Sequence, residues 1–190
     1  IWGMETNYGS IRGDVPVLSA LATLASQGRR RSMFEAQLLS TFEIINQGIK
    51  LPNQILGSWA GAMGHTQFMP KSYIDFAISA NSGKSDIWSD DPADALTSTA
   101  NFLICHGWIP DTPWGEVAYF SKNEDLPSLL KYPPQWIKDW KNLGLLSEKS
   151  STQNYVAQLV LPGGVSSLGF LVSENFNALL RYNNAPAYAI

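Results

Sequence analysis

The chain has 190 residues and a formal net charge of −3, and 45% of its residues are hydrophobic while 15% are charged. Because average soluble proteins carry about 25% charged residues, this balance favours a folded core and excludes a disordered chain. The sequence has no long basic run and no apolar run near the roughly 20 residues of a membrane span, so it predicts neither a nucleic-acid partner nor a transmembrane helix.

The chain opens with IWGMETNYG, which has neither an initiator methionine nor the pattern of a signal peptide. We therefore expect a processed or trimmed chain. A lipid anchor, if the protein has one, is expected outside these residues.

Two helices are predicted in residues 14–48, from apolar residues spaced three or four positions apart. The first covers residues 14–27, with Asp14 as its N-cap. The second starts with a capping box, Ser32-Met33-Phe34-Glu35, and Gly48 can end it.

Two more helices follow along the chain. One starts near Pro70, and the other begins at Asp91-Pro92 and stops at Gly107. The loops between the four helices carry the unusual residues, above all the stretch AGAMGHTQFMP at 60–70. The front part of the chain is therefore predicted to be all-helical.

The pattern changes after Trp108, where proline and turn formers become frequent and one strand is predicted at 116–120. The stretch PPQWIKDWKNLG predicts a short amphipathic helix. The stretch NYVAQLVLPGGVSSLGFLV predicts two strands around a Pro-Gly-Gly turn. The tail returns to helix, with Ser173 and Asn175 as candidate caps.

The predicted fold class is therefore mainly α. A helical core formed by residues 1–108 and 173–190 is interrupted by a small α+β insertion, residues 109–172. The sequence shows no internal repeat that would indicate a solenoid.

The candidate chemistry narrows by elimination. His65 and His106 lie far apart in the sequence, without the spacing of zinc ligands, so no metal site is predicted. Cys105 and His106 are neighbours, but adjacent helical residues point about 100° apart and cannot form a nucleophile pair. No GxSxG elbow, P-loop or dinucleotide fingerprint occurs. The remaining candidates for catalysis are the carboxylate side chains.

Glu5 differs from the other acids because Ile1, Trp2 and Met4 precede it and Tyr8 follows it three positions later. A carboxyl group surrounded by apolar atoms is disfavoured in its charged form, and it can hold a proton near neutrality. That property suits a general acid for an acetal oxygen. An ordinary glutamate at a helix end, bonded to nearby backbone groups, fits the residues equally well.

Five segments, in this order, resemble motifs of lytic murein transglycosylases of the membrane-bound lytic transglycosylase B type. They are ETNYG, LSALATLA, GSWAGAMGHTQFMPKSY, DPADALTSTANFLICHGW and RYNNAPAYA. The resemblance covers residues 1–108 and about 170–190 and is weak across the insertion. It implies a lysozyme-like helical core that cleaves, without hydrolysis, the β-1,4 bond between N-acetylmuramic acid and N-acetylglucosamine in peptidoglycan.

The resemblance implies that Glu5 is the single catalytic acid and base. Glu5 would first protonate the glycosidic oxygen and then accept a proton from the C6 hydroxyl that closes a 1,6-anhydro ring. This plan departs from the usual pair of glycosidase carboxylates. The implied partner is the glycan strand of peptidoglycan, and the implied location is the periplasm or cell envelope, including the outer membrane if an anchor exists. We expect a monomer without a cofactor.

The resemblance also places seven side chains at the substrate: Ser58, Gln67, Phe68, Phe102, Tyr182, Asn183 and Tyr188. The serine and glutamine offer neutral hydrogen-bonding groups, and aromatic rings suit the apolar faces of sugars. Phe102 stands where the family often has a tyrosine, so it lacks that hydroxyl. For Gln67 the residues leave a second interpretation open, a buried turn in which its amide satisfies loop carbonyls.

Relatives of this type can carry a calcium loop rich in aspartate between the third and fourth helices. Here the region reads ISANSGKSDIWSDDPAD, with Asn81, Ser82, Lys84 and Ser85 where acidic ligands would stand. Calcium takes six to eight oxygen ligands, normally including several carboxylates, and a lysine opposes the ion. We predict no tight calcium site.

Two other functions remain open. A lysozyme-type muramidase on the same fold would need a positioned water and usually a second carboxylate, for which Asp14 is the nearest candidate in sequence. A catalytically silent glycan-binding domain would keep the groove without turnover, and the intact Glu5 argues against it.

Overall fold

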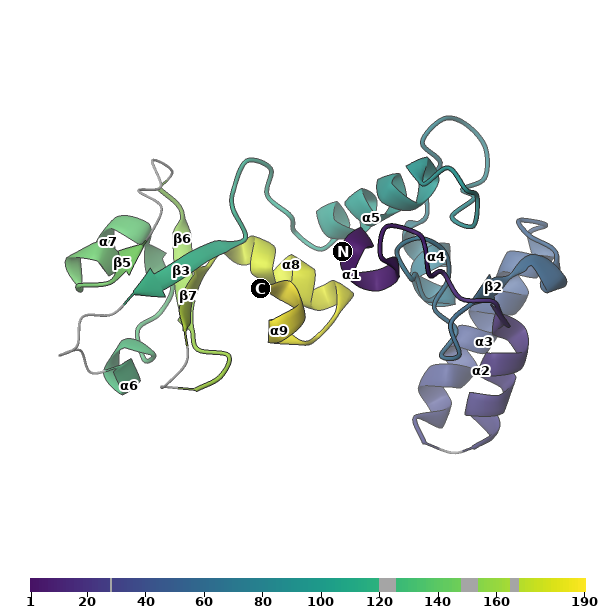
Figure 1. The fold of residues 1–190 in the computed structure, drawn as a ribbon, viewed down its shortest axis with the longest axis horizontal. Coiled ribbons are helices and arrows are strands. Elements are labelled where there is room, and N and C mark those ends of the chain that lie inside the picture. Colours follow the sequence, from purple (N-terminus) through teal and green to yellow (C-terminus); the bar gives the residue numbers. More distant parts are fainter. Residues whose placement is uncertain (28, 120–125, 148–153, 165–167) are drawn as a thin grey trace. The chain divides into compact units, whose positions relative to one another are not determined.

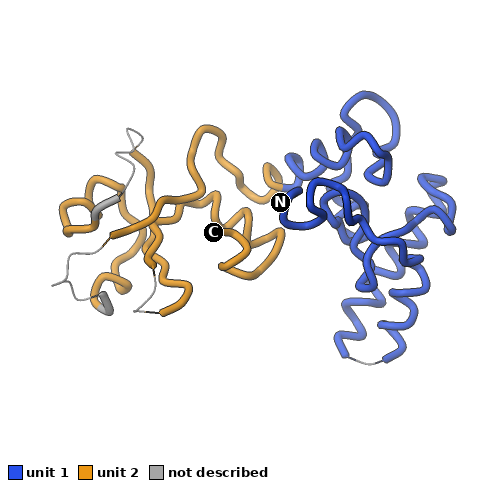
Figure 2. Tube along the Cα trace, viewed as in Figure 1, with its two compact units in different colours: residues 1–102 blue, residues 103–190 orange. Residues whose placement is uncertain are grey.

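The computed structural model describes residues 1–27, 29–119, 126–147, 154–164 and 168–190. The chain divides into two compact units, residues 1–102 and residues 103–190 (Figure 2). Within the described ranges, no helix combines the length and the apolar character needed to cross a bilayer.

The first unit is built from helices and two very short strands (Figure 1). β1 and β2 pair antiparallel. The four helices predicted from apolar spacing are confirmed as α2 to α5, the last of which continues into the second unit. The elements in chain order are α1 (Trp2–Thr6), β1 (Val15–Pro16), α2 (Val17–Ser26), α3 (Arg31–Asn46), the 3₁₀ helix η1 (Pro52–Gln54), β2 (Leu56–Gly57), α4 (Pro70–Phe76) and α5 (Ala93–Cys105).

Two predicted helix starts are wrong. α2 begins at Val17 without a side-chain cap, and Asp14 is exposed. The reason is the β1–β2 pairing, which lets the Val17 N–H donate to the Ile55 carbonyl at 3.0 Å. α3 begins at Arg31, also without a side-chain cap, and Glu35 does not close a capping box. Its carboxylate instead accepts a hydrogen bond from Arg31 Nε at 2.7 Å.

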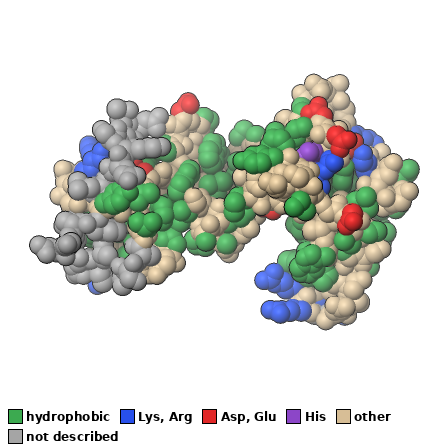
Figure 3. Space-filling view, in the orientation of Figure 1, with side chains coloured by type: hydrophobic (Ala, Val, Ile, Leu, Met, Phe, Trp, Pro, Cys, Tyr) green, Lys and Arg blue, Asp and Glu red, His purple; other side chains and the backbone are tan. Residues whose placement is uncertain are grey.

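The core of the first unit lies between α2, α3 and the segment that precedes α4. On α2 the buried residues are spaced four positions apart, which places them on one face of the helix. α2 and α3 lie side by side, and basic side chains gather at the tip of this pair (Figures 1 and 3). The buried side chains that form this core include Val17, Leu21, Ala25, Ile44, Ile55, Met63 and Phe68.

The segment between α4 and α5 is organised by the carboxylate of Asp94. This group accepts hydrogen bonds from the backbone N–H groups of Ala80 and Asp86, both at 2.7 Å, and from the Ser79 hydroxyl at 3.2 Å. Burial opposes ionisation of Asp94, but the three donors outweigh it and hold its pKa below the ordinary value. The ionised carboxylate therefore holds this segment together.

We expect this carboxylate to make the first unit sensitive to acid. The pKa of Asp94 is lower in the folded chain than its ordinary value of 3.8, so its contribution to stability is complete above that value and is lost as the pH falls through the folded-state pKa. Asp94→Asn should therefore flatten the acid-induced decline in the free energy of unfolding, and the exposed Asp14→Asn should not. Urea unfolding at several pH values measures this, and an unchanged decline in D94N would contradict it.

The second unit is a five-stranded antiparallel sheet, in the order β4-β6-β7-β3-β5, with short helices (Figure 1). The predicted strand at 116–120, the amphipathic helix and the strand pair are confirmed as β3, α7 and β6–β7. Phe120 and the turn residues 165–167 lie outside the described residues. The elements are β3 (Gly115–Tyr119), α6 (Leu126–Leu129), β4 (Gln135–Trp136), α7 (Ile137–Asn142), β5 (Leu146–Ser147), β6 (Val156–Val160), β7 (Gly169–Val172), α8 (Glu174–Tyr182) and α9 (Pro186–Ala189).

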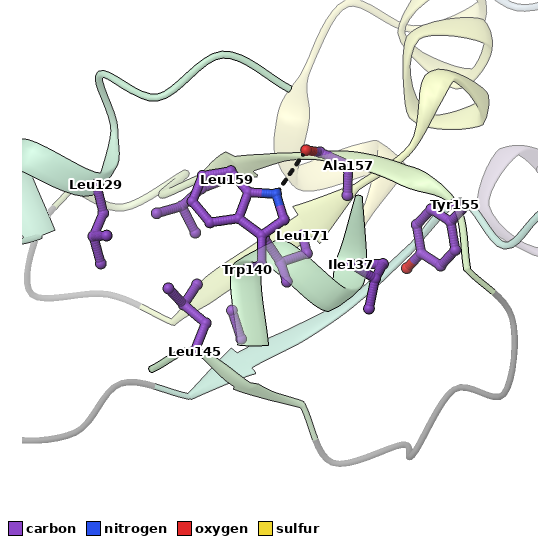
Figure 4. Close-up of a cluster of buried hydrophobic side chains, with 9 residues drawn as sticks. Leu129, Ile137, Trp140, Leu145, Tyr155, Ala157, Leu159 and Leu171 are labelled. Carbon is purple, nitrogen blue, oxygen red and sulfur yellow. Dashed lines mark hydrogen bonds between the residues drawn. The ribbon is translucent and has the colours of Figure 1, made fainter. Parts of the chain in front are cut away.

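Successive residues of β7 face opposite sides of the sheet. Leu171 joins a cluster around Trp140 of α7, as Figure 4 shows, whereas Val172 packs with Phe176 of α8. Trp140 is fully buried, and its indole N–H donates to the Ala157 carbonyl at 2.8 Å. The sheet therefore has one apolar cluster on each face, and the larger one is centred on Trp140.

The C-terminal tail is anchored within the second unit. Ser173 caps α8, as predicted, by accepting a hydrogen bond from the Asn175 N–H at 3.1 Å. Asn175 is fully buried, and its amide bonds to backbone groups of the segment that precedes β3. The tail thus shares a compact unit with the insertion. The division into a core of residues 1–108 and 173–190 and an insertion of 109–172 stays a prediction.

Candidate active site

Glu5 lies on α1, a helix of five residues without a side-chain cap. Its side chain is half-buried, as is that of Trp2. Met4 and Tyr8 are 67% and 69% exposed. The apolar surroundings predicted for Glu5 are therefore only partly present.

Thr6 ties this short helix to the loop that carries Gln67. Thr6 is 1% exposed, and its hydroxyl donates to the backbone carbonyl of His65 at 2.6 Å. The same oxygen accepts a hydrogen bond from the Gly9 N–H at 2.9 Å. Because Thr6 follows Glu5 directly, its bond to the His65 carbonyl fixes the end of α1 relative to the loop, while the Gly9 bond closes the turn after α1.

His65 extends the connection to the segment before α5. It is 4% exposed, and its Nε2 lies 2.8 Å from the Ser89 carbonyl, which requires the proton on Nε2. Arg12 lies beside it and donates to the carbonyls of Trp88 and Ser89 at 3.0 and 2.8 Å. The Arg12 guanidinium also pairs with Asp90 at 2.7 Å, and this bond lowers the pKa of that exposed carboxyl.

We expect Thr6→Val, which keeps the shape of the side chain but removes its hydroxyl, to lower kcat roughly 10- to 100-fold with little change in KM. The reason is that the sequence resemblance assigns catalysis to Glu5, and a displacement of about 1 Å in a catalytic group can cost about 100-fold. Thr6→Ser, which keeps the hydroxyl, should retain most of the activity. Steady-state kinetics on soluble muropeptides, the substrate that the sequence resemblance implies, checks this, and equal losses in both variants would contradict it.

Gln67 ends a four-residue loop closed by paired backbone bonds between Met63 and Phe68, at 2.8 and 2.9 Å. Its Nε2 donates to the carbonyls of Arg12 at 3.1 Å and Gly64 at 3.0 Å. The interpretation in which this amide satisfies loop carbonyls is therefore correct for its nitrogen. Oε1 is the atom that the half-buried side chain can offer to a ligand.

Backbone strain occurs on both sides of this connection. Asn7, Tyr8 and Gln67 have φ values of 47°, 56° and 56°, in the left-handed region that residues other than glycine rarely adopt. Such conformations persist only where the surrounding structure enforces them, and they cluster at functional sites. The strain therefore supports a functional role for the turn after Glu5 and for the Gln67 loop.

Ser58 lies where three stretches of backbone meet. Its N–H donates to the Ala62 carbonyl at 2.8 Å, and its Oγ accepts a hydrogen bond from the Ala62 N–H at 3.1 Å. A Cβ on Gly13 would lie 2.3 Å from the Gly57 carbonyl oxygen, and one on Gly57 would lie 2.1 Å from that of Ala62. The segment after Glu5 therefore packs directly, backbone on backbone, against the segment that carries Ser58.

Phe68 and Phe102 are core residues of the first unit, with 2% and 6% exposure. Their ring centroids are 6.0 Å apart, and Phe76 packs edge-on against Phe102 at 5.0 Å. Both rings therefore belong to the core on which the Gln67 loop packs. Side chains this deeply buried are not expected to contact substrate directly. Their assignment to substrate binding stays a prediction.

Tyr182, Asn183 and Tyr188 belong to the second unit. The first two lie at the end of α8 and the third lies on α9. Asn183 is exposed, and the two tyrosines are half-buried. Their role at the glycan also stays a prediction.

Among the described residues, no group of three or more His, Cys, Asp or Glu side chains is placed to hold a metal. In the loop before α5, Lys84 donates to the carbonyls of Gln47 and Gly48, so an ammonium already bonds carbonyl oxygens there. Asp86 accepts from Lys50 at 2.6 Å. Asp94 accepts backbone N–H groups, so this donor set does not fit a calcium ion.

Sequence reasoning assigned no role to Thr6 or Arg12 and considered His65 only as a metal ligand. Their contacts join positions 53 to 77 residues apart, which no local spacing reveals. The one sequence feature that could have indicated these contacts is the glycine-rich loop around His65, because polar residues in such a loop are expected to be buried and hydrogen-bonded.

The whole chain, residues 1–190, matches the family described as "Transglycosylase SLT domain". It is 32% identical over 198 residues to membrane-bound lytic murein transglycosylase B of Escherichia coli strain K12, covering 100% of this chain and 52% of that protein. The chain thus spans about half the length of the curated relative that it matches.

Solved structures give the same family. SltB3 from Pseudomonas aeruginosa, in complex with NAG-anhNAM-pentapeptide, is 42% identical with a TM-score of 0.88, over 99% of this chain and 52% of that chain. The Escherichia coli lytic transglycosylase Slt35, in complex with calcium, is 30% identical with a TM-score of 0.75, over 99% and 60%. The predicted family and the predicted fold class, a mainly α lysozyme-like core with a small α+β insertion, are confirmed.

Proposed function

Because the chain belongs to the family of transglycosylase SLT domains, we propose that it forms the catalytic part of a lytic transglycosylase. Its reaction is cleavage of the β-1,4 bond between N-acetylmuramic acid and N-acetylglucosamine in peptidoglycan, with a 1,6-anhydromuramoyl end as product. The name of the SltB3 complex, which includes an anhydro sugar and a pentapeptide, supports this substrate class.

One observation carries the proposal. The hydroxyl of Thr6 binds the His65 carbonyl at 2.6 Å, and so the helix with Glu5 is joined to the loop with Gln67. A carboxyl group and neutral hydrogen-bonding groups, held on two strained and tightly linked segments, are what an acid/base site for a saccharide requires.

In the proposed mechanism, Glu5 acts twice. In the first step its protonated carboxyl gives the proton to the glycosidic oxygen, the C1–O bond breaks, and the leaving sugar departs with a new hydroxyl. In the second step the carboxylate takes the proton of the C6 hydroxyl while that oxygen bonds to C1. Glu5 is protonated again, the muramoyl residue becomes a 1,6-anhydro sugar, and no water is consumed.

Ser58 and Gln67 would hold the substrate with complementary atoms. The Ser58 Oγ already accepts a hydrogen bond from the Ala62 N–H. Its hydroxyl proton would therefore be donated to a sugar or acetamido oxygen of the substrate. The Gln67 nitrogen is bound to loop carbonyls, which assigns its Oε1 to accept from a substrate N–H or O–H. A donor and an acceptor of this kind suit an acetamido group, which has one of each.

Analysis of digestion products tests the proposed function. Purified sacculi treated with the protein should release muropeptides with anhydro ends, identified by mass spectrometry as 18 mass units lighter than reducing-end products. Reducing ends would identify a muramidase instead. Binding without release of fragments would identify a silent glycan-binding domain.

The proposed place of action is the bacterial cell envelope, where peptidoglycan lies. The relatives named above support this location by their cell-wall substrate. A periplasmic location, a lipid anchor outside this chain, the monomeric state and the lack of a cofactor stay predictions.

A further inference from the structure

Two buried nitrogen atoms of the first unit have no hydrogen-bond partner among the described residues, and the proposed mechanism gives them no role. They are Nε1 of Trp2, which lies on α1 three residues before Glu5, and Nδ1 of His65, which lies two residues before Gln67. Buried polar groups in folded proteins are nearly always hydrogen-bonded. These two exceptions, beside residues proposed to act on the substrate, therefore require an explanation.

One of the two nitrogen atoms is a donor and the other is an acceptor. The indole Nε1 of Trp2 carries a hydrogen and can only donate. In His65 the hydrogen on Nε2 is donated to the Ser89 carbonyl at 2.8 Å, and a neutral imidazole protonated there accepts at Nδ1. Each group therefore lacks the partner that the other offers.

The two rings also lie close together. Their centroids are 5.9 Å apart and their planes are inclined by 67°, so the contact is edge to face. Gly9, in the turn after α1, shows how near the nitrogen atoms are. A Cβ on Gly9 would lie 2.4 Å from Nδ1 of His65 and 3.5 Å from Nε1 of Trp2. Both atoms thus lie within 3.5 Å of one point, and a small movement of either ring would join them.

The position of Trp2 on the helix connects this contact with Glu5. Trp2 and Thr6 are four residues apart, so they share one face of α1, and both contact His65. Thr6 bonds the backbone carbonyl of His65, whereas Trp2 meets its ring. One attachment alone would allow α1 to turn about its axis. Two attachments on the same face fix that rotation, and with it the direction of the Glu5 side chain.

We propose that Trp2 and His65 are positioning residues for Glu5, and that the indole N–H of Trp2 donates to Nδ1 of His65 once the glycan is bound. Hydrogen bonds that serve catalysis are often long in the free enzyme and tighten in the substrate complex. Formation of this bond holds α1 against the Gln67 loop and aims the Glu5 carboxyl at the glycosidic oxygen. The inference rests on the proposed function, because it concerns the same acid and the same substrate class.

NMR tests the bond itself, on the full chain carrying Glu5→Gln with isotopically labelled tryptophan and histidine side chains. The probe is a tetrasaccharide of alternating N-acetylglucosamine and N-acetylmuramic acid, whose binding is followed separately by calorimetry. Its addition should shift the indole N–H proton of Trp2 downfield, as expected when this group gains an acceptor. His65→Gln should abolish the shift, because glutamine can still donate to the Ser89 carbonyl but has no acceptor in the place of Nδ1.

Steady-state kinetics on soluble muropeptides tests the positioning role. Trp2→Phe keeps an aromatic ring but removes the N–H, and it should lower kcat roughly 10-fold, the value of one hydrogen bond, with little change in KM. His65→Gln should cause a similar loss. The double variant should lose no more than either single one, because both substitutions remove the same interaction.

Trp136→Phe is the matched control, since it makes the same change at a tryptophan of the second unit that is 46% exposed. It should leave kcat and KM unchanged. An unchanged kcat in Trp2→Phe would overturn the proposal, even if its thermal stability falls. Losses that multiply in the double variant would also overturn it, as would a Trp2 signal that does not move while the tetrasaccharide binds. Failure of the proposed function is a separate result, which would show as the absence of anhydro products from the wild type.

Discussion

Replacing Glu5 with glutamine is expected to lower the rate of sacculus cleavage roughly 1,000-fold or more. A single general acid/base group typically contributes about 100- to 10,000-fold, and here one side chain is assigned both proton transfers. The amide can neither protonate the leaving oxygen nor take the C6 hydroxyl proton. Because glutamine has nearly the same size and Glu5 is only half-buried, the thermal unfolding of E5Q should match that of the wild type.

Release of anhydro-muropeptides, followed by chromatography, measures this effect. Glu43→Gln is the control, since Glu43 is an exposed glutamate of α3 and its loss should leave the rate unchanged. If E5Q cleaves sacculi as fast as the wild type, Glu5 is not the catalyst. If neither protein cleaves, the glycan-binding interpretation is favoured.

The second large effect is expected on stability, at Trp140. Trp140→Ala should lower the free energy of unfolding of the second unit by roughly 3–5 kcal/mol. The indole is fully buried in the cluster of Figure 4, and its removal leaves a cavity and removes the hydrogen bond that it donates to the Ala157 carbonyl. Small domains are stable by only about 5–15 kcal/mol, so the loss takes much of the total.

Trp136→Ala is the matched control, because Trp136 precedes α7 directly and is 46% exposed. Its removal should cost far less than that of Trp140. Hydrogen exchange resolved along the sequence measures both variants and shows which unit loses protection. A loss in W140A no larger than in W136A, or one confined to residues 1–102, would refute the expectation.

The sequence predicted the elements whose signal is local. The spacing of Val17, Leu21 and Ala25 predicts the apolar face of α2, and the alternation in the last strands predicts the β6–β7 pair. Helix starts were less predictable because long-range partners compete for the same groups. The Val17 N–H bonds Ile55, and so Asp14 has no capping role.

The site was only partly predictable for the same reason. Glu5, Ser58 and Gln67 stand in recognisable motifs, so their positions could be taken from the resemblance. The contact of Thr6 with His65 spans 59 positions and depends on the folded loop. The amide nitrogen of Gln67 donates to backbone carbonyls, and the sequence could offer this only as an alternative. The motif indicates that the Gln67 amide binds substrate, whereas the structure shows that its nitrogen binds the backbone.

The direct packing of main chain at Gly13, Gly57 and Ala62 bears on how this protein can evolve. No side chain separates those peptide groups. Backbone atoms alone therefore set the spacing between the segment after Glu5 and the segment that carries Ser58. The exposed side chains next to Glu5 and Ser58 in sequence, Met4 and Trp59, can then change without altering this backbone packing. The side chains proposed to contact the glycan can therefore vary while the geometry needed for the proposed proton transfers is kept.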